Sequence, residues 1–170
     1  MNTTPALTPQ PTIYRHTQTG TLLLTVMGIL FAVVSTAATL SLMLSGAAFF
    51  GAWVSWLAVV VLLTAGVMLA SLTVTVTPTE LRVAFGAGLV HRTIPLAIVR
   101  GAEPVRNSWW WGWGIRWTPY GWLWCVAGLD AVQITYASGR QFRVGTNQPK
   151  ELSAALYAAI ASQPQGREGN

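Results

Sequence analysis

The chain has 170 residues, of which 52% are apolar and 9% are charged, whereas soluble proteins carry about 25% charged residues. Its mean hydropathy is +0.48. Such a composition argues against a disordered chain, a coiled coil or an ordinary soluble enzyme, and it favours a membrane protein with one modest domain. Ten basic residues against five acidic ones give a net charge of +5.

The first 20 residues are rich in Thr, Pro and Gln and have no apolar period. Segments of this composition do not bury enough apolar surface to fold. Residues 1–20 are therefore predicted to form a disordered cytoplasmic tail.

Two apolar runs follow, over residues 21–44 and 49–72. Each is long enough to cross a hydrocarbon core of about 30 Å as a helix. The short link at 45–48 makes the two helices antiparallel, so residues 21–72 are predicted to form a transmembrane hairpin. A cleaved signal peptide is disfavoured, because the first run exceeds the 7–15 apolar residues typical of such signals.

Arginine placement gives the orientation of this hairpin. Arg15 precedes the first run, Arg82 and Arg92 follow the second, and the link carries no charge. By the positive-inside rule, both termini face the cytoplasm. We therefore expect a multi-pass protein of the inner or plasma membrane.

Residues 73–162 are predicted to form a small, mostly-β domain of six or seven short strands. Apolar and polar residues alternate over 72–77, 80–85 and 89–94, a further strand is expected to begin in 96–99, and Ser138-Gly139 supplies the turn of a hairpin over 131–145. Residues 149–161 have one apolar helical face and begin with proline. This closing helix suggests an open barrel or bent sheet plugged at one end, followed by a polar tail over 163–170.

Several short motifs resemble one family. They are Thr77–Val83 (TPTELRV), Ile94–Val99 (IPLAIV), Gly112–Arg116 (GWGIR), Gly121–Leu123 (GWL), Gly128–Val132 (GLDAV) and Gly139–Asn147 (GRQFRVGTN). Over about residues 20–160 the chain resembles bacterial membrane proteins that have two N-terminal spans and a pleckstrin-homology-like domain.

The resemblance implies a fold similar to pleckstrin-homology domains, with a seven-stranded bent sheet and a C-terminal helix. It implies no catalytic residues. Relatives of this fold often bind phosphoinositides through basic loops near their first strands. The corresponding turn here, Thr77–Thr79, has no cluster of lysine or arginine, which argues against a site of that type.

Residues 109–124 contain seven tryptophans, and two arginines accompany them. Indoles at headgroup depth and guanidinium groups on lipid phosphates would make a membrane contact. The same residue types are enriched in protein–protein hot spots. Core packing of alternate tryptophans is a third interpretation. The candidate residues for contact with lipid or a partner are Arg106, Trp109, Trp110, Trp111, Trp113, Arg116 and Trp117.

The arginines of residues 82–116 also have two interpretations. They outnumber the acidic residues there and would attract anionic lipid headgroups. Alternatively, they form a solvated face that obeys the positive-inside rule. Nucleic acid is not expected as a partner, because the arginines are spread singly along the chain.

Catalytic residue types are sparse. His16 lies in the predicted tail, His91 lies on a predicted strand, and Cys125 sits in an apolar segment. The five carboxylates are scattered, with no spacing typical of a metal or acid–base site. We therefore expect no catalytic residue, no metal and no cofactor.

These observations favour a non-enzymatic binding or scaffold domain presented at the inner membrane surface. Its expected partners are the lipid bilayer, with anionic headgroups or another membrane protein. One alternative is an accessory subunit whose hairpin itself binds the partner. A weaker alternative is an enzyme with an unrecognised site.

Overall fold

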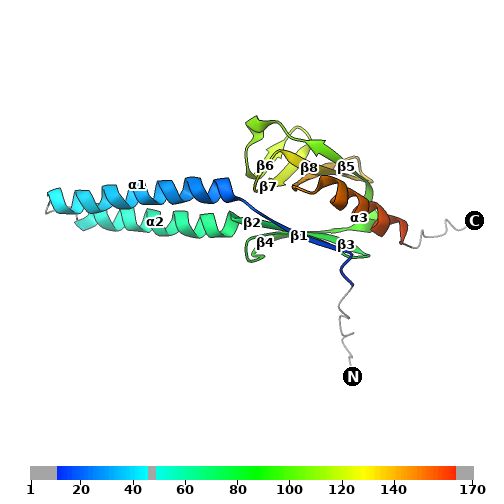
Figure 1. Cartoon of the computed structure of the whole chain (residues 1–170), viewed down its shortest axis with the longest axis horizontal. Coiled ribbons are helices and arrows are strands. Elements are labelled where there is room, and N and C mark those ends of the chain that lie inside the picture. The colour runs from blue at the N-terminus through cyan, green and yellow to red at the C-terminus, as the bar shows by residue number, and fades with distance from the viewer. Residues whose placement is uncertain (1–10, 46–48, 164–170) are drawn as a thin grey trace, which may run out of the picture.

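The computed structural model describes residues 11–45 and 49–163. Two long helices project side by side from one end of a β domain (Figure 1). Residues 46–48 of the expected link, the first ten residues and the polar tail beyond residue 163 lie outside the described residues.

The described chain forms nine strands and three α-helices, with two short 3-10 helices between them. In chain order they are β1 (Tyr14–Thr19), α1 (Thr21–Ser45), α2 (Phe49–Leu69), β2 (Ser71–Val76), β3 (Glu80–Phe85), β4 (Val90–Pro95), η1 (Leu96–Ile98), β5 (Val99–Arg106), η2 (Trp109–Trp111), β6 (Gly114–Thr118), β7 (Gly121–Cys125), β8 (Asp130–Tyr136), β9 (Gln141–Gly145) and α3 (Pro149–Ala161).

The helix pair carries most of the apolar residues. Over Thr21–Met43, α1 is apolar and long enough to cross a membrane, and it is the only helix of the described residues that meets this test. The apolar part described for α2, Trp53–Leu69, is shorter. The side chains of both helices are largely exposed, unlike those of a core helix in a soluble protein. The helix ends at Leu69 rather than at the expected residue 72, because Ser71 already pairs with Thr19.

The first sheet has the order β1-β2-β3-β4, with every neighbour antiparallel. The expected disordered tail over residues 1–20 is therefore wrong for Tyr14–Thr19, which pair with β2 along its whole length. Gln18, buried in this strand, donates a hydrogen bond from Nε2 to the Ala127 carbonyl. Long-range pairing orders a segment whose own composition does not favour a strand.

The second sheet has the order β5-β8-β9-β7-β6, in which β7 and β9 are parallel and the other neighbours are antiparallel. The hairpin expected at 131–145 is confirmed as β8 and β9. Of the segment 96–99, where a further strand is expected to begin, Leu96–Ile98 form η1 instead and only Val99 belongs to the strand, β5.

A single core lies between the two sheets and α3. The helix expected at 149–161 is confirmed as α3, whose buried Leu152, Leu156 and Ala159 contribute to this core. The largest fully buried side chains include Phe85 from the first sheet and Phe142 from the second. The mostly-β domain is thus two packed sheets closed by one C-terminal helix (Figure 1).

At the junction, the helix pair continues directly into the first sheet. The Gly20 N–H donates to the Ala70 carbonyl at 2.7 Å, one position beyond the Thr19–Ser71 pair. Gly86 has a φ of +51°, and a Cβ there would lie 2.6 Å from the Met68 carbonyl oxygen. The β3–β4 turn therefore presses against the last turn of α2 so closely that only glycine fits.

Alanine substitutions at two neighbouring glycines test this contact. Gly88 also has a positive φ, of +88°, but no atom lies within 4 Å of its would-be Cβ. We expect G88A to lower the free energy of unfolding by about 1–2 kcal/mol, the usual cost of left-handed backbone. We expect G86A to lower it further, because its Cβ also meets the Met68 carbonyl. Urea unfolding of the full chain in micelles measures both, and equal losses would contradict the contact.

Candidate functional site

The tryptophans of residues 109–124 are mostly on the surface. Trp109, Trp110, Trp117 and Trp122 are 64%, 74%, 67% and 38% exposed, and we call these four the tryptophan surface. Only Trp124 belongs to the core cluster, where it packs against Phe85 and Phe142. The interpretation that alternate tryptophans fill the core therefore holds for Trp124 and fails for the exposed four.

Two of these tryptophans sit on a tight turn, residues 107–113, which we call the tryptophan turn. Backbone hydrogen bonds from the Trp111 N–H to the Ser108 carbonyl and from the Gly112 N–H to the Trp109 carbonyl close it. The chain leaves the turn at Gly112, whose φ of +57° is a conformation that favours glycine. The rings of Trp109 and Trp110 stack with centroids 3.9 Å apart and point into solvent.

The other two belong to the β6–β7 hairpin. Trp117 and Trp122 are opposite each other in the ladder, and their rings meet edge to face at 5.4 Å. Tyr120, in the hairpin turn, reaches back to the ring of Trp111 at 5.5 Å. The tryptophan turn and the hairpin thus touch through Trp111 and Tyr120.

A buried arginine beneath this contact holds it in place. Arg143 on β9 is 6% exposed, and its Cζ lies 4.0 Å from the Tyr120 ring centroid and 5.3 Å from that of Trp111. Its guanidinium donates to Gln133 Oε1 from Nε and Nη2 and to Asn107 Oδ1 from Nη1. Burial lowers the pKa of Arg143, but an arginine remains protonated at neutral pH. The sequence reading overlooked this residue.

A second set of contacts ties the tryptophan turn to the helix junction. The Trp113 indole donates from Nε1 to the Gly128 carbonyl at 3.3 Å. The preceding carbonyl, that of Ala127, accepts from Gln18 of β1 at 3.1 Å. A Cβ on Gly20 would lie 2.9 Å from the Val126 carbonyl oxygen. The loop over 126–128 therefore connects the end of β1 and the start of α1 to the tryptophan turn.

The two arginines of the predicted site are both exposed. Arg116 on β6 donates from Nε to the Trp113 carbonyl at 3.1 Å, so its guanidinium stays beside the tryptophan turn. Arg106 ends β5, next to the start of that turn. The structure therefore places Trp109–Trp111, Trp113 and Arg116 at the tryptophan turn, with Trp111 and Trp113 half-buried, whereas Trp117 lies on the β6–β7 hairpin beside Trp122.

The residues considered for catalysis lie apart from one another. His91 is exposed on β4 with its Nδ1 3.0 Å from the Gly88 carbonyl. His16 is on β1, where its Nε2 contacts Asn147 Oδ1. Cys125 is buried, and burial raises its pKa to about 11. Within the described ranges, no group of three or more His, Cys, Asp or Glu side chains is arranged to hold a metal ion.

No protein-family model, curated protein or solved structure matches the chain.

Replacing Arg143 with lysine tests its role under the tryptophan turn. Lysine keeps the charge but loses the forked hydrogen bonds to Gln133 and the flat stack on Tyr120. We expect R143K to lower the free energy of unfolding by about 1.5–3 kcal/mol, the range for hydrogen bonds to charged groups. The matched control R100K, at an exposed arginine of β5, should stay within about 0.5 kcal/mol of the parent. Equal stability of R143K and R100K in urea unfolding would contradict this role.

The raised pKa of Cys125 predicts that its thiol reacts slowly with alkylating reagents. Alkylation requires the thiolate, and a pKa of about 11 leaves very little thiolate at pH 8. We expect iodoacetamide to label the folded chain slowly at pH 8, faster as the pH rises toward 11, and rapidly in urea. Mass spectrometry measures the labelled fraction over time. Rapid labelling of the folded chain at pH 7 would instead indicate an activated thiol.

Proposed function

We propose that the chain is a membrane-anchored binding protein without catalytic activity. In this proposal α1 and α2 cross the membrane as a hairpin, and both termini face the cytoplasm. The β domain, similar to pleckstrin-homology domains, stands at the inner surface of the bilayer. Its tryptophan surface, with Arg106 and Arg116, contacts anionic lipid headgroups.

The exposure of the helices supports the anchor. Apolar side chains on several sides of α1 and α2 are exposed, including Val33, Val54 and Val60, each 56–61% exposed. Such surface is stable in lipid and unfavourable in water. Moreover, β1 precedes α1 and belongs to the first sheet. Removal of α1 as a signal peptide would also remove a strand of the folded domain, which argues against a cleaved signal.

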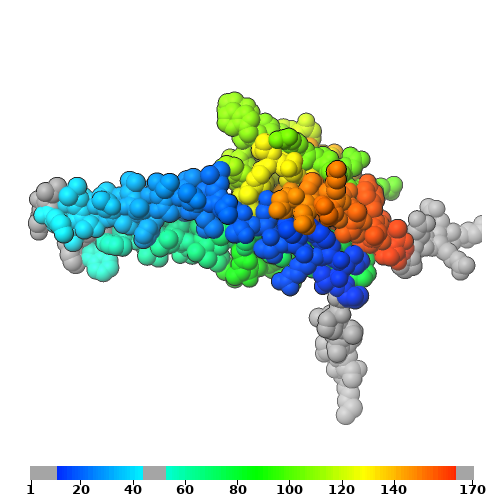
Figure 2. Space-filling model, in the orientation of Figure 1, coloured from blue at the N-terminus to red at the C-terminus, as the bar shows by residue number. Residues whose placement is uncertain are grey.

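The position of the tryptophan surface is the observation that carries the proposal. The segment that contains η2 (lime green) projects from the flank of the β domain, at the end from which the helices leave (Figure 2). The contacts of Trp113 with Gly128 and of Gln18 with Ala127 hold it next to the helix junction. If the helices span the bilayer, this surface stands at headgroup depth, where tryptophan is enriched in membrane proteins.

The arginines beside the tryptophans add an electrostatic contribution. Arg106 and Arg116 are exposed, and neither forms an ion pair with a carboxylate of the described residues. A basic residue held at an anionic membrane surface gains about 1 kcal/mol. Indole insertion and arginine attraction would thus act together at one place on the domain.

Two packed sheets with one C-terminal helix support the proposed likeness to pleckstrin-homology domains. The described residues form nine strands, against the seven of that fold. β1 is an additional strand in front of the first helix, and β7 pairs in parallel with β9. The likeness therefore rests on the layers and the closing helix.

One feature of α1 favours the alternative of an accessory subunit. Ser35, Thr36 and Thr39 line a shallow groove on this helix together with Leu40 and Met43. The hydroxyls of Thr36 and Thr39 bond to carbonyls of their own helix, whereas Ser35 Oγ is buried without a hydrogen-bond partner. Small and hydroxylated residues of this kind let another transmembrane helix approach closely. A membrane-protein partner would then dock on the hairpin.

Flotation with vesicles tests the proposed lipid contact. The domain must keep β1, so we would replace Thr21–Leu69 by the turn Asn-Gly, which joins β1 to β2 as a hairpin. We expect this variant to float with anionic vesicles, less so at high salt and weakly with neutral vesicles. R116Q should weaken binding about fivefold, which corresponds to about 1 kcal/mol. W109A/W110A should abolish most of the flotation.

The control is Y157A, which removes an exposed aromatic side chain from α3, away from the tryptophan turn. We expect it to float like the parent variant. Near-UV circular dichroism establishes that each variant is folded. If the folded W109A/W110A variant floats as well as its parent, the lipid proposal is wrong. If the folded parent does not float at all, the accessory-subunit alternative replaces it.

A further inference from the structure

Two adjoining hollows lie where the edges of the two sheets meet. The larger, of about 350 Å³, lies between β4, η1 and the turn that joins β8 to β9. The smaller, of about 230 Å³, extends toward Trp117 and Trp122. Both are lined by Arg92, Tyr136 and Arg140. The larger volume is in the range of small-molecule sites.

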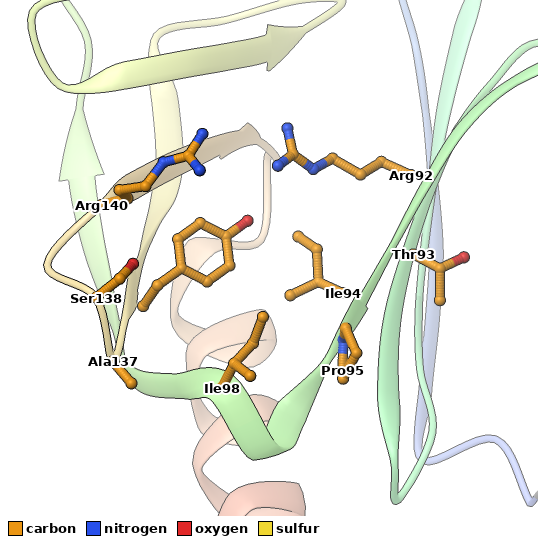
Figure 3. Close-up of a pocket in the computed structure, with 9 residues that line it drawn as sticks. Arg92, Thr93, Ile94, Pro95, Ile98, Ala137, Ser138 and Arg140 are labelled. Carbon is orange, nitrogen blue, oxygen red and sulfur yellow. The ribbon is translucent and has the colours of Figure 1, made fainter.

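Two arginines converge at the boundary between these hollows. The guanidinium groups of Arg92 and Arg140 point toward each other across the hollow (Figure 3). Arg92 is fixed by stacking on the Phe142 ring, with its Cζ 4.8 Å from the centroid. Arg140 belongs to a turn closed by hydrogen bonds from the Tyr136 N–H to the Arg140 carbonyl and from the Gly139 N–H to the Tyr136 carbonyl.

No negative charge of the described residues balances this pair. Neither guanidinium forms an ion pair with a described carboxylate, and no carboxylate lines either hollow. Two like charges that face each other destabilise the fold, and an anion between them would reverse that effect. Because guanidinium donors are forked, such an anion would accept several parallel hydrogen bonds.

Tyr136 lines both hollows together with the two arginines. Its oxygen is buried, and its O–H has no acceptor among the described residues. Burial raises the pKa of Tyr136, and the charges of Arg92 and Arg140 partly offset this rise. The phenol is therefore protonated at neutral pH and offers one more donor. A buried donor without an acceptor is costly, so a ligand oxygen there would stabilise the protein.

We propose that these hollows form a binding site for a phosphate monoester with an apolar body. A phosphate monoester carries a charge near −2 at neutral pH and has three terminal oxygens. It therefore matches two guanidinium charges and the Tyr136 donor, whereas a carboxylate has one charge and two oxygens. The apolar body covers Pro95 and Ile98 in the larger hollow, of which Ile98 is 47% exposed in the empty site.

The strand register places Arg92, at the boundary of the two hollows, on the aqueous side of the headgroups, whereas the smaller hollow extends toward the headgroup depth proposed for Trp117 and Trp122. Arg92 pairs with Val83, and Val83 pairs with Val74, which is three residues beyond the first residue of β2. At about 3.3 Å per residue, the backbone of Arg92 stands about 10 Å beyond the start of β2. The headgroup layer is about 5–8 Å thick on each side. The ligand is therefore a soluble ester rather than a lipid, a step that rests on the proposed membrane orientation.

Calorimetric titration of the full chain in maltoside micelles tests the site, with phenyl phosphate and inorganic phosphate as probes. We expect phenyl phosphate to bind more tightly, because its ring covers Ile98. R140Q should weaken both probes at least about tenfold, as expected for the loss of a charge-assisted hydrogen bond. I98S should weaken phenyl phosphate alone. The control R100Q, an exposed arginine outside both hollows, should bind like the parent.

Y136F separates binding from folding. Removing the unpaired hydroxyl should leave the thermal midpoint unchanged or higher, while phenyl phosphate binds several-fold more weakly. If folded R140Q binds phenyl phosphate as well as the parent, or if the parent binds neither probe, the proposal is overturned. Equal affinity for both probes would overturn the apolar part of the site.

A comparison of nanodiscs distinguishes the source of the phosphate. Phenyl phosphate should bind equally in nanodiscs of phosphatidylcholine alone and in nanodiscs that also contain phosphatidic acid. Weaker binding in the second kind would mean that a lipid headgroup occupies the arginine pair, which would overturn the assignment to a soluble ester. This result is independent of the vesicle test, because the tryptophan surface and the arginine pair are changed by different substitutions.

Discussion

The structure depends on how two helices become two strands. Packed helices stand 8–10 Å apart, whereas paired strands are about 4.8 Å apart, so the two chain segments must converge at the junction. The Gly20 N–H bonds to the Ala70 carbonyl there, and the Leu24 N–H bonds back to the Gly20 carbonyl. The last rung of the β1–β2 ladder thus adjoins the first turn of α1. Because the strand pair is also the edge of the first sheet, the direction of the helices is set by the β domain.

This junction also explains where the exposed tryptophans lie. Gly20 allows the Val126 carbonyl to approach, and Gln18 bonds to the next residue of that loop. The same loop accepts the hydrogen bond of Trp113 through the Gly128 carbonyl. A short path of contacts therefore runs from the start of α1 to the tryptophan turn, and no flexible linker separates the two. The tryptophan turn is therefore held at a fixed place beside the start of α1.

The sequence predicted those helices and strands that have a clear apolar pattern in their own residues. The apolar runs, the alternation in Glu80–Phe85 and the apolar face of α3 all correspond to observed elements. β1 has no such signal, because its polar residues become a strand only by pairing with a segment more than fifty residues away. Arg143 is similar: alternation places it on the outer face of the sheet, but its burial depends on Trp111 and Tyr120 folding over it. The predicted site residues lie close together in the sequence, whereas the arginines of the hollow come from β4 and from the turn between β8 and β9.

The tryptophan surface and the arginine pair are mechanically connected. Tyr120 contacts Trp111 on one side and lines the smaller hollow with Trp117 and Trp122 on the other. Arg143 lies under Tyr120 and is bonded to the neighbouring strand β8, which leads to Tyr136. A domain whose tryptophans rest on a surface would therefore present the arginine pair at a constant height and orientation above it. Close-packed protein interiors deform little. A ligand in the hollow and a surface under the tryptophans would therefore act on the same rigid body.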